Sequence, residues 1–189
     1  MDEQLILLRY RQKPPEGYHL VDLSDVSKQI WKRLSPAIIS NVYCYGGLSS
    51  KTMHNAWTYS HVYPEHDDGG KPNADWYTWR DTGFSREKAI IKPMKDSKPI
   101  YIWWNGVRFG EIEARKNIYI PLYLRSIKNS QTFKELRRLY ERGNKLALKE
   151  WHSYPLDDGK TSKDALNDIS RNFSYAFIVY HLLTNCELL

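Results

Sequence analysis

Aromatic side chains in the middle of the chain constrain the fold more than any other feature of this sequence. Of the seven tryptophans, five lie between Ser50 and Trp104, together with four tyrosines. These tryptophans are Trp57, Trp76, Trp79, Trp103 and Trp104. Burial of so much aromatic surface repays the chain entropy that keeps other sequences disordered. We therefore expect a folded core that takes most of these rings, while the others can stack on a ligand.

A β-hairpin is the clearest local prediction. The run Pro99–Trp104 precedes Asn105–Gly106, and Val107–Phe109 follows it. Asn-Gly tolerates the positive φ angles of a type I′ turn, so the two runs should pair as antiparallel strands. Trp103 and Trp104 are neighbours on a strand and should point to opposite faces, so one can belong to the core while the other lines a pocket.

Helical and strand patterns alternate along the rest of the chain. Further strands are expected at Leu5–Tyr10, Ile38–Tyr45 and Leu146–Leu148. Helices are expected from Asp22 or Ser24 to Leu34, Ser49 or Ser50 to Tyr63, Asn73 to Gly83, Glu111 to Lys128, Thr132 to Gly143, after Thr161–Asp164, and from Asn172 to Leu183. Pro121 should kink or break its helix. For 189 residues, this pattern predicts a single domain, residues 1–189, of mixed α+β class: helix-rich, with a few short strands and one β-hairpin.

Positive charge is concentrated in one segment. The chain has 28 Lys+Arg and 22 Asp+Glu, a net charge of +6, and Arg108–Lys149 alone holds eleven Lys/Arg against four Asp/Glu. Such a basic segment beside a neutral remainder favours an anionic partner: nucleic acid, a nucleotide or another phosphorylated ligand. The alternative is a pair of ordinary solvated helices.

Membrane insertion and secretion are not expected. No apolar run approaches the roughly 20 residues of a membrane span, and the longest, Phe177–Leu183, contains His181. The start, Met1–Glu3, is acidic where a signal peptide would be basic. Cys44 and Cys186 lack CxxC spacing, so neither a zinc site nor a disulfide framework is supported. These features predict a cytoplasmic protein.

One helix line mixes a cation with phenols and a carboxylate. Arg115, Tyr119 and Tyr123 are spaced i,i+4, and Glu111 extends the line. A guanidinium flanked by two phenols suits a phosphate or carboxylate. Alternatively, Glu111 and Arg115 form an ordinary surface pair.

Familiar catalytic and metal motifs are absent. His54, His61 and His66, followed by Asp67 and Asp68, suggest a metal site but lack the HExxH spacing. The sequence has no G-x-S-x-G elbow, P-loop or G-x-G-x-x-G. We expect no bound metal and no cofactor.

The segment Met53–Tyr63 resembles the signature helix of the NADAR group of N-glycosidases, which act on ADP-ribose derivatives and riboflavin precursors. The family motif reads approximately Ser/Val-Glu-His/Asn-Ala-aromatic-Gln-x-x-Lys, and Trp57 stands at its aromatic position. His54, Thr58 and His61 stand where the motif has glutamate, glutamine and lysine. The stretch from Ala89 to Ile127, which contains Lys92-Pro93-Met94 and Glu113-Ala114-Arg115-Lys116, also resembles uncharacterised bacterial and phage proteins.

This resemblance implies a NADAR-like fold and a division of roles. Trp57 and one of Trp103 or Trp104 would stack on the base or sugar. The phosphate contacts would come from Lys92, Arg115 and Lys116, with Tyr119 and Tyr123 beside them. The family usually has an acidic residue shortly before its last helix, which would be Asp157 or Asp158, and His54 is the third catalytic candidate. A carboxylate stabilises the oxocarbenium-like transition state of N-glycoside cleavage, and Glu111 or Glu113 could also supply it.

Three functions remain open on the sequence. The chain could recognise a nucleotide, an ADP-ribose adduct or a modified nucleobase, with or without hydrolysis of an N-glycosidic bond. It could instead be a non-enzymatic nucleic-acid-binding protein that uses Arg108–Lys149, whose affinity would fall steeply with salt. It could also be a phage-type protein that binds a host protein, in which case it would act in the host cytoplasm.

Overall fold

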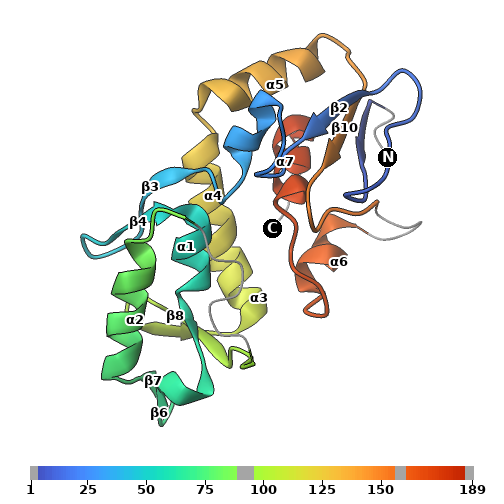
Figure 1. The fold of residues 1–189 in the computed structure, drawn as a ribbon. Helices are drawn as coiled ribbons and strands as arrows, with labels where there is room; N and C mark the ends of the chain where they lie inside the picture. Colours follow the sequence, from blue (N-terminus) through green and yellow to red (C-terminus); the bar gives the residue numbers. More distant parts are fainter. Residues whose placement is uncertain (1–3, 89–95, 156–160, 186–189) are drawn as a thin grey trace. The chain divides into compact units, whose positions relative to one another are not determined.

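The computed structural model describes residues 4–88, 96–155 and 161–185. These residues form helices and small sheets, which confirms the predicted mixed α+β class (Figure 1). The chain divides into two compact units, and each is described by itself. Unit 1 contains Met1–Ser35 and Leu124–Leu189, and unit 2 contains Pro36–Tyr123. A single domain spanning residues 1–189 stays a prediction.

Unit 1 is built on a three-stranded parallel sheet in the order β1-β10-β2. The strands are β1 (Leu5–Leu7), β10 (Leu146–Lys149) and β2 (His19–Asp22). Leu5 pairs with Leu146, which in turn pairs with His19. Leu146, Ala147 and Leu148 are all buried, as is typical of a parallel strand covered on both faces.

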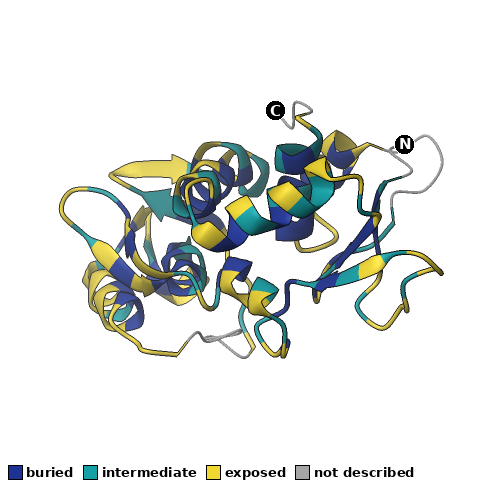
Figure 2. Cartoon of the chain, turned by 90° about the horizontal axis from the view of Figure 1, so that it is seen from above, coloured by how far each residue is buried: buried dark blue, intermediate teal, exposed yellow. Residues whose placement is uncertain are grey.

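Unit 1 also contains helical segments, some of which contact this sheet. They are the 3₁₀ helix η1 (Ile30–Leu34), α5 (Gln131–Glu141), α6 (Ser162–Asn167) and α7 (Tyr175–Thr184). Helix α7 contacts β1 and β10, whereas η1 contacts β2 and α5. Side-chain caps begin the α-helices but not η1: the Ser130 hydroxyl accepts from the Phe133 N–H, and Thr161 and Asp164 form a capping box. Figure 2 shows how buried and exposed residues alternate along the helices.

The helix predicted from Asp22 or Ser24 to Leu34 is wrong in length. Only Ile30–Leu34 is helical, and Val26 and Ile30 are 60% and 45% exposed, so they do not form a buried helix face. Side chains hold the backbone in turns instead: Asp22 Oδ1 accepts from the N–H and hydroxyl of Ser24, and Gln29 Oε1 accepts from the Asp22 N–H. Such local side-chain bonds compete with helix formation.

Unit 2 contains only antiparallel strand pairs among its described residues. Its strands are β3 (Ser40–Tyr43), β4 (Ser49–Thr52), β5 (His61–Val62), β6 (Asp67–Asp68), β7 (Lys71–Pro72), β8 (Tyr101–Trp104) and β9 (Val107–Phe109). The sheet β5-β8-β9 contains the predicted hairpin, with Asn105 and Gly106 at φ angles of 49° and 79°. The pairs β3-β4 and β6-β7 add to the one hairpin predicted.

The helices of unit 2 cover both faces of β8. They are α1 (Met53–Thr58), the 3₁₀ helix η2 (Pro64–His66), α2 (Ala74–Phe84), α3 (Glu111–Ala114), the π-helical turn η3 (Arg115–Tyr119) and α4 (Ile120–Ile127), whose last residues belong to unit 1. Tyr101 packs with Trp76 of α2, whereas its neighbour Ile102 packs with Ala114 and Ile118 on the other side. This alternation places α2 against one face and α3–η3 against the other.

The helix predicted from Ser49 or Ser50 to Tyr63 is also wrong in extent. Its first residues form strand β4, and its last ones form β5, where His61 pairs with Ile102. Trp103 donates its N–H to the Ser60 carbonyl at 2.9 Å. The backbone just after α1 therefore forms hydrogen bonds with β8 instead of continuing the helix. His61 is therefore on a strand rather than on the helix that carries Trp57.

Candidate functional site in unit 2

Charged and aromatic side chains from α1, β5, α3 and η3 lie close together in unit 2. We call His61, Glu111, Arg115, Trp57 and Tyr119 the unit 2 cluster. His61 Nδ1 lies 2.9 Å from the carbonyl oxygen of Trp57. A carbonyl oxygen can only accept a hydrogen bond, so this ring nitrogen carries the proton. The other ring nitrogen, Nε2, lies 3.8 Å from Glu111 Oε2. The tautomer is thus set by the backbone of α1, and Nε2 faces the carboxylate.

Glu111 is shared between two cationic partners. Its Oε1 accepts from Arg115 Nε at 2.9 Å, while Oε2 faces His61. Burial alone would raise the pKa of Glu111, but the interactions with His61 and Arg115 outweigh it and lower the pKa. Glu111 is therefore ionised at neutral pH and carries a stable negative charge in a half-buried position.

Arg115 is a buried cation and not a surface one. Only 3% of it is exposed, whereas the Glu111 side chain is 35% exposed. The interpretation of Glu111 and Arg115 as an ordinary surface pair is therefore wrong. Removing the carboxylate would take this partner away from a buried guanidinium and should lower the stability of the fold.

Aromatic rings border the charged groups. The Trp57 ring lies 5.0 Å from that of His61 and 5.0 Å from that of Tyr119, both edge-on. The rings of Tyr119 and Tyr123 are nearly parallel, at an interplanar angle of 8°. Of the four residues predicted to line up along one helix face, Glu111 contacts Arg115, and Tyr119 contacts Tyr123. Tyr123 is fully buried, whereas Trp57 is half-buried and can face a ligand.

The line is carried by a π-helical turn. In η3 the Ile120 N–H donates to the Arg115 carbonyl, five residues back, and Pro121 follows immediately. Proline has no N–H and its ring crowds the carbonyl four residues earlier, so the ordinary helical register is weakened at this point. Single π-helical turns are frequent at functional sites.

The two adjacent tryptophans of β8 separate as predicted. Trp103 packs against the cluster of Val62, Trp76 and Tyr101. Trp104 packs on the opposite face against Ile102, Ala114 and Ile118, and Trp57 packs against the same cluster. Of the two, Trp104 therefore lies on the side of the unit 2 cluster.

The other predicted site residues are placed less fully. His54 lies three residues before Trp57 in α1 and is half-buried, and Lys116 is half-buried in η3. Lys92, Asp157 and Asp158 lie outside the described residues. The sequence names Glu111 as one candidate carboxylate and His61 at the lysine position of the motif, but it does not predict their pairing, because the pairing depends on the β5–β8 ladder.

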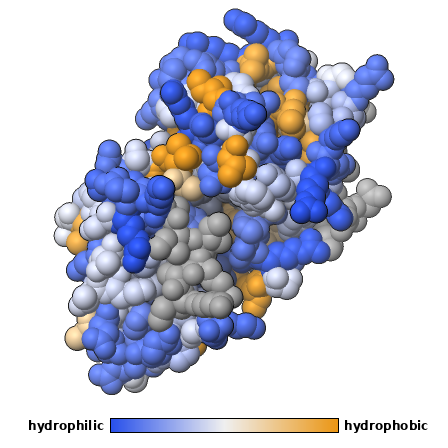
Figure 3. All heavy atoms as spheres, viewed as in Figure 1, coloured by the Kyte–Doolittle hydropathy of each residue, from blue (hydrophilic) through white to orange (hydrophobic). Residues whose placement is uncertain are grey.

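The basic segment Arg108–Lys149 spans residues of both units. In unit 1, Lys134, Arg138 and Arg142 recur every fourth residue and are exposed on or at the end of α5. Most of the molecular face drawn in Figure 3 is hydrophilic, with hydrophobic residues in separate spots.

Among the described residues, no three His, Cys, Asp or Glu side chains form a metal-binding group. No helix in that part of the chain is long and apolar enough to cross a bilayer.

Comparison with protein-family models, curated proteins and solved structures finds no match for this chain. The chemistry of the unit 2 cluster and the resemblance in Met53–Tyr63 are therefore the basis for assigning a function.

Proposed function

We propose that unit 2 binds a nucleotide or another N-glycoside at the unit 2 cluster and hydrolyses its N-glycosidic bond. The observation that carries this proposal is the His61–Glu111–Arg115 network beside the half-buried Trp57. Trp57 and His61 also stand at the aromatic and lysine positions of the NADAR motif that this segment resembles.

The cluster supplies the groups that this hydrolysis needs. In this scheme His61 acts in the form that carries a proton on both ring nitrogens, and it donates the Nε2 proton to the leaving base as the bond between the base and the sugar C1′ breaks. The ionised Glu111 stabilises the positive charge that develops on the sugar and takes a proton from the water that adds to C1′. Arg115 holds the carboxylate ionised and in place, and is a positioning residue in this scheme.

A substrate panel tests the proposal directly. The 189-residue chain is incubated with NAD, ADP-ribose derivatives, nucleoside monophosphates and riboflavin precursors, and released base is measured by liquid chromatography and mass spectrometry. We expect turnover of at least one compound. Glu111→Gln, whose amide oxygen can still accept from Arg115, should lower kcat by about 100-fold or more.

Glu113→Gln is the matched control. Glu113 lies in the same helix, is exposed, and accepts from the Gly110 N–H, a bond that glutamine also makes. This variant should keep wild-type turnover. No turnover of any compound, or equal turnover by wild type and Glu111→Gln, would refute the proposal. Loss on Asp157→Ala but not on Glu111→Gln would move the carboxylate role away from Glu111.

Binding of nucleic acid without catalysis is the second candidate. The exposed Lys134, Arg138 and Arg142 on α5 favour it, because cations on one helix face can follow a phosphate backbone. This function predicts affinity that falls steeply with salt and that drops in a triple Ala variant of these three residues. If the ligand binds at the unit 2 cluster instead, its affinity should depend less on salt and should be lost in Trp57→Ala.

A further inference from the structure

The loops after the three parallel strands of unit 1 bring together a second set of residues. Tyr10 follows β1, Trp151 follows β10 and Asp25 follows β2, so all three lie at the carboxyl ends of neighbouring parallel strands. In open sheets with parallel strands, this edge is the usual place for ligand binding. The set is separate from the unit 2 cluster and contains none of its residues.

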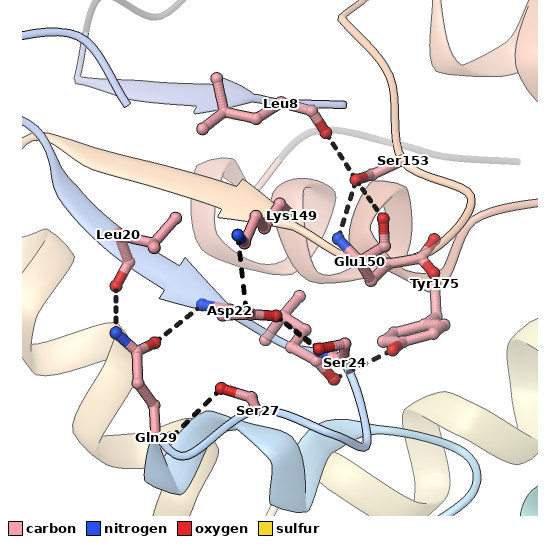
Figure 4. Close-up of polar contacts among 11 residues, drawn as sticks. Leu8, Leu20, Asp22, Ser24, Ser27, Gln29, Lys149, Glu150, Ser153 and Tyr175 are labelled. Atoms are coloured by element: carbon pink, nitrogen blue, oxygen red, sulfur yellow. Dashed lines mark hydrogen bonds and ion pairs between the residues drawn. The ribbon is translucent and has the colours of Figure 1, made fainter. Parts of the chain in front are cut away.

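Polar contacts hold this edge firmly in shape (Figure 4). The Ser153 hydroxyl donates to the Leu8 carbonyl at 2.6 Å and accepts from the Glu150 N–H at 2.8 Å, so it ties the turn after β10 to the end of β1. The Tyr175 hydroxyl of α7 donates to the Leu23 carbonyl after β2 at 2.9 Å. The Lys149 carbonyl accepts from the Leu23 N–H at 2.9 Å, so the chain just before Trp151 is attached to both neighbouring strands.

Trp151 is exposed and yet fixed in orientation. Its indole N–H donates to Asp25 Oδ1 at 2.7 Å, and one face of its ring stacks on Tyr10, with ring centroids 3.9 Å apart and an interplanar angle of 27°. Trp151 remains 46% exposed, which places its other face in solvent. A rigid ring with one open face can stack on a flat ligand with little loss of side-chain entropy.

Cations outnumber carboxylates around the ring pair. Lys149 lies 5.5 Å from the Tyr10 ring centroid, and the exposed Arg9 and Arg11 flank Tyr10 in a turn that the Gln12 N–H closes on the Arg9 carbonyl. Two carboxylates also lie here: Asp22 Oδ2 lies 3.5 Å from Lys149 Nζ, and Asp25 Oδ1 accepts from the Trp151 indole. A flat ring beside arginines matches a base with its phosphate.

We propose that Trp151, backed by Tyr10, is a stacking platform for an unpaired nucleobase whose phosphate is bound by Arg9 or Arg11. The shared chemistry is that of a base carrying a phosphate, from either a free nucleotide or a single-stranded nucleic acid. The site is independent of hydrolysis at the unit 2 cluster.

Fluorescence anisotropy with a labelled oligouridylate tests the platform. The wild type should bind the single strand more tightly than a duplex of equal length, because paired bases cannot stack on Trp151. Trp151→Ala should weaken binding by about tenfold or more, whereas Trp151→Phe should retain most of it. Arg9→Ala with Arg11→Ala should weaken binding and flatten its salt dependence. Competition by uridine monophosphate distinguishes the two sources: full competition indicates a nucleotide site, and weak competition indicates a strand site.

Tyr43→Ala is the control. Tyr43 is an aromatic residue of unit 2 that is 54% exposed, so its loss should leave binding unchanged. Trp57→Ala is measured in parallel, because Trp57 belongs to the unit 2 cluster and its loss reports binding of the probe there. Equal binding by wild type and Trp151→Ala, or no binding by the wild type, would overturn the proposal. So would loss of binding in Trp57→Ala alone, since the base would then sit in unit 2. Circular dichroism establishes that each variant is folded.

Discussion

Glu150 should make the stability of unit 1 depend on pH. Its carboxyl group is fully buried where β10 ends. Oε2 accepts from the His152 N–H at 2.9 Å, whereas Oε1 has no hydrogen-bond partner among the described residues. Burial raises the pKa of Glu150 from 4.5 to about 7, although the Ser174 hydroxyl and the His152 N–H act in the opposite direction. The folded protein therefore binds this proton more tightly than the unfolded chain does.

The sign and size of the effect follow from these two pKa values. Below pH 4.5 the group is protonated in both states, so it contributes no pH dependence. As the pH rises from 4.5 to about 7, the unfolded chain releases the proton first and the free energy of unfolding falls. Above pH 7 the loss is complete and amounts to about 3 kcal/mol, since each pH unit between the two values corresponds to about 1.4 kcal/mol.

Urea unfolding of wild type and Glu150→Gln at several pH values between about 5 and 8 measures this loss. Glutamine keeps the bond from His152 but cannot ionise, so its buried amide changes stability equally at every pH. The difference between the two proteins should therefore shift by about 3 kcal/mol across the range in favour of the variant. Glu141→Gln, on the exposed end of α5, should run parallel to wild type. If the Glu150→Gln curve also runs parallel to wild type, then Glu150 is already ionised at low pH in the folded protein and the reasoning fails.

Two further predictions concern unit 2. Gly83→Ala should lower the free energy of unfolding by about 3 kcal/mol, because the new Cβ would lie 2.0 Å from the Tyr59 ring. Thr82→Ala, at an exposed position of the same helix, is the control and should be neutral or stabilising. Urea unfolding measures both variants. His66 should make unit 2 less stable in acid, because burial lowers the pKa of its ring below 6.5 and outweighs the opposite effect of nearby carboxylates. Its contribution is complete above pH 6.5 and is lost as the pH falls through the lower folded-state pKa, so His66→Phe should remove this fall. An unchanged acid limb in the variant would contradict the assignment.

Local signals in the sequence predicted the elements that depend on few residues. The Asn105–Gly106 turn forms as expected because its φ angles need only those two residues. Helix α2 begins where predicted, since the Asn73 side chain accepts from the Trp76 N–H. The opposite directions of Trp103 and Trp104 follow from strand geometry alone. The identity of the partners on each face did not follow, because α2 and η3 reach β8 only in the folded chain.

Pairing between distant segments explains why the helix predicted to reach Tyr63 ends earlier. The pattern of Met53–Tyr63 suits a helix, but the bonds of Ser60 and Val62 to β8 are made only when Ile100–Trp103 comes alongside. The same ladder turns His61 toward Glu111. A histidine that reads as the end of a helix thus becomes the partner of a carboxylate from a different element. Periodicity along one segment carries no information about such a pair.

Pro121 affects the helix at residues that precede it. The sequence predicts that this proline kinks or breaks its helix; the chain stays helical at the proline, and the irregular turn lies at Arg115–Tyr119. A proline disturbs the carbonyl groups of the preceding turn, since these lose their N–H partner and meet its ring. The strain therefore appears before the proline, in the residues that carry Arg115 and Tyr119. The residue that weakens the helix is outside the unit 2 cluster, but it determines the helical register in which the buried guanidinium and the phenol of that cluster are presented.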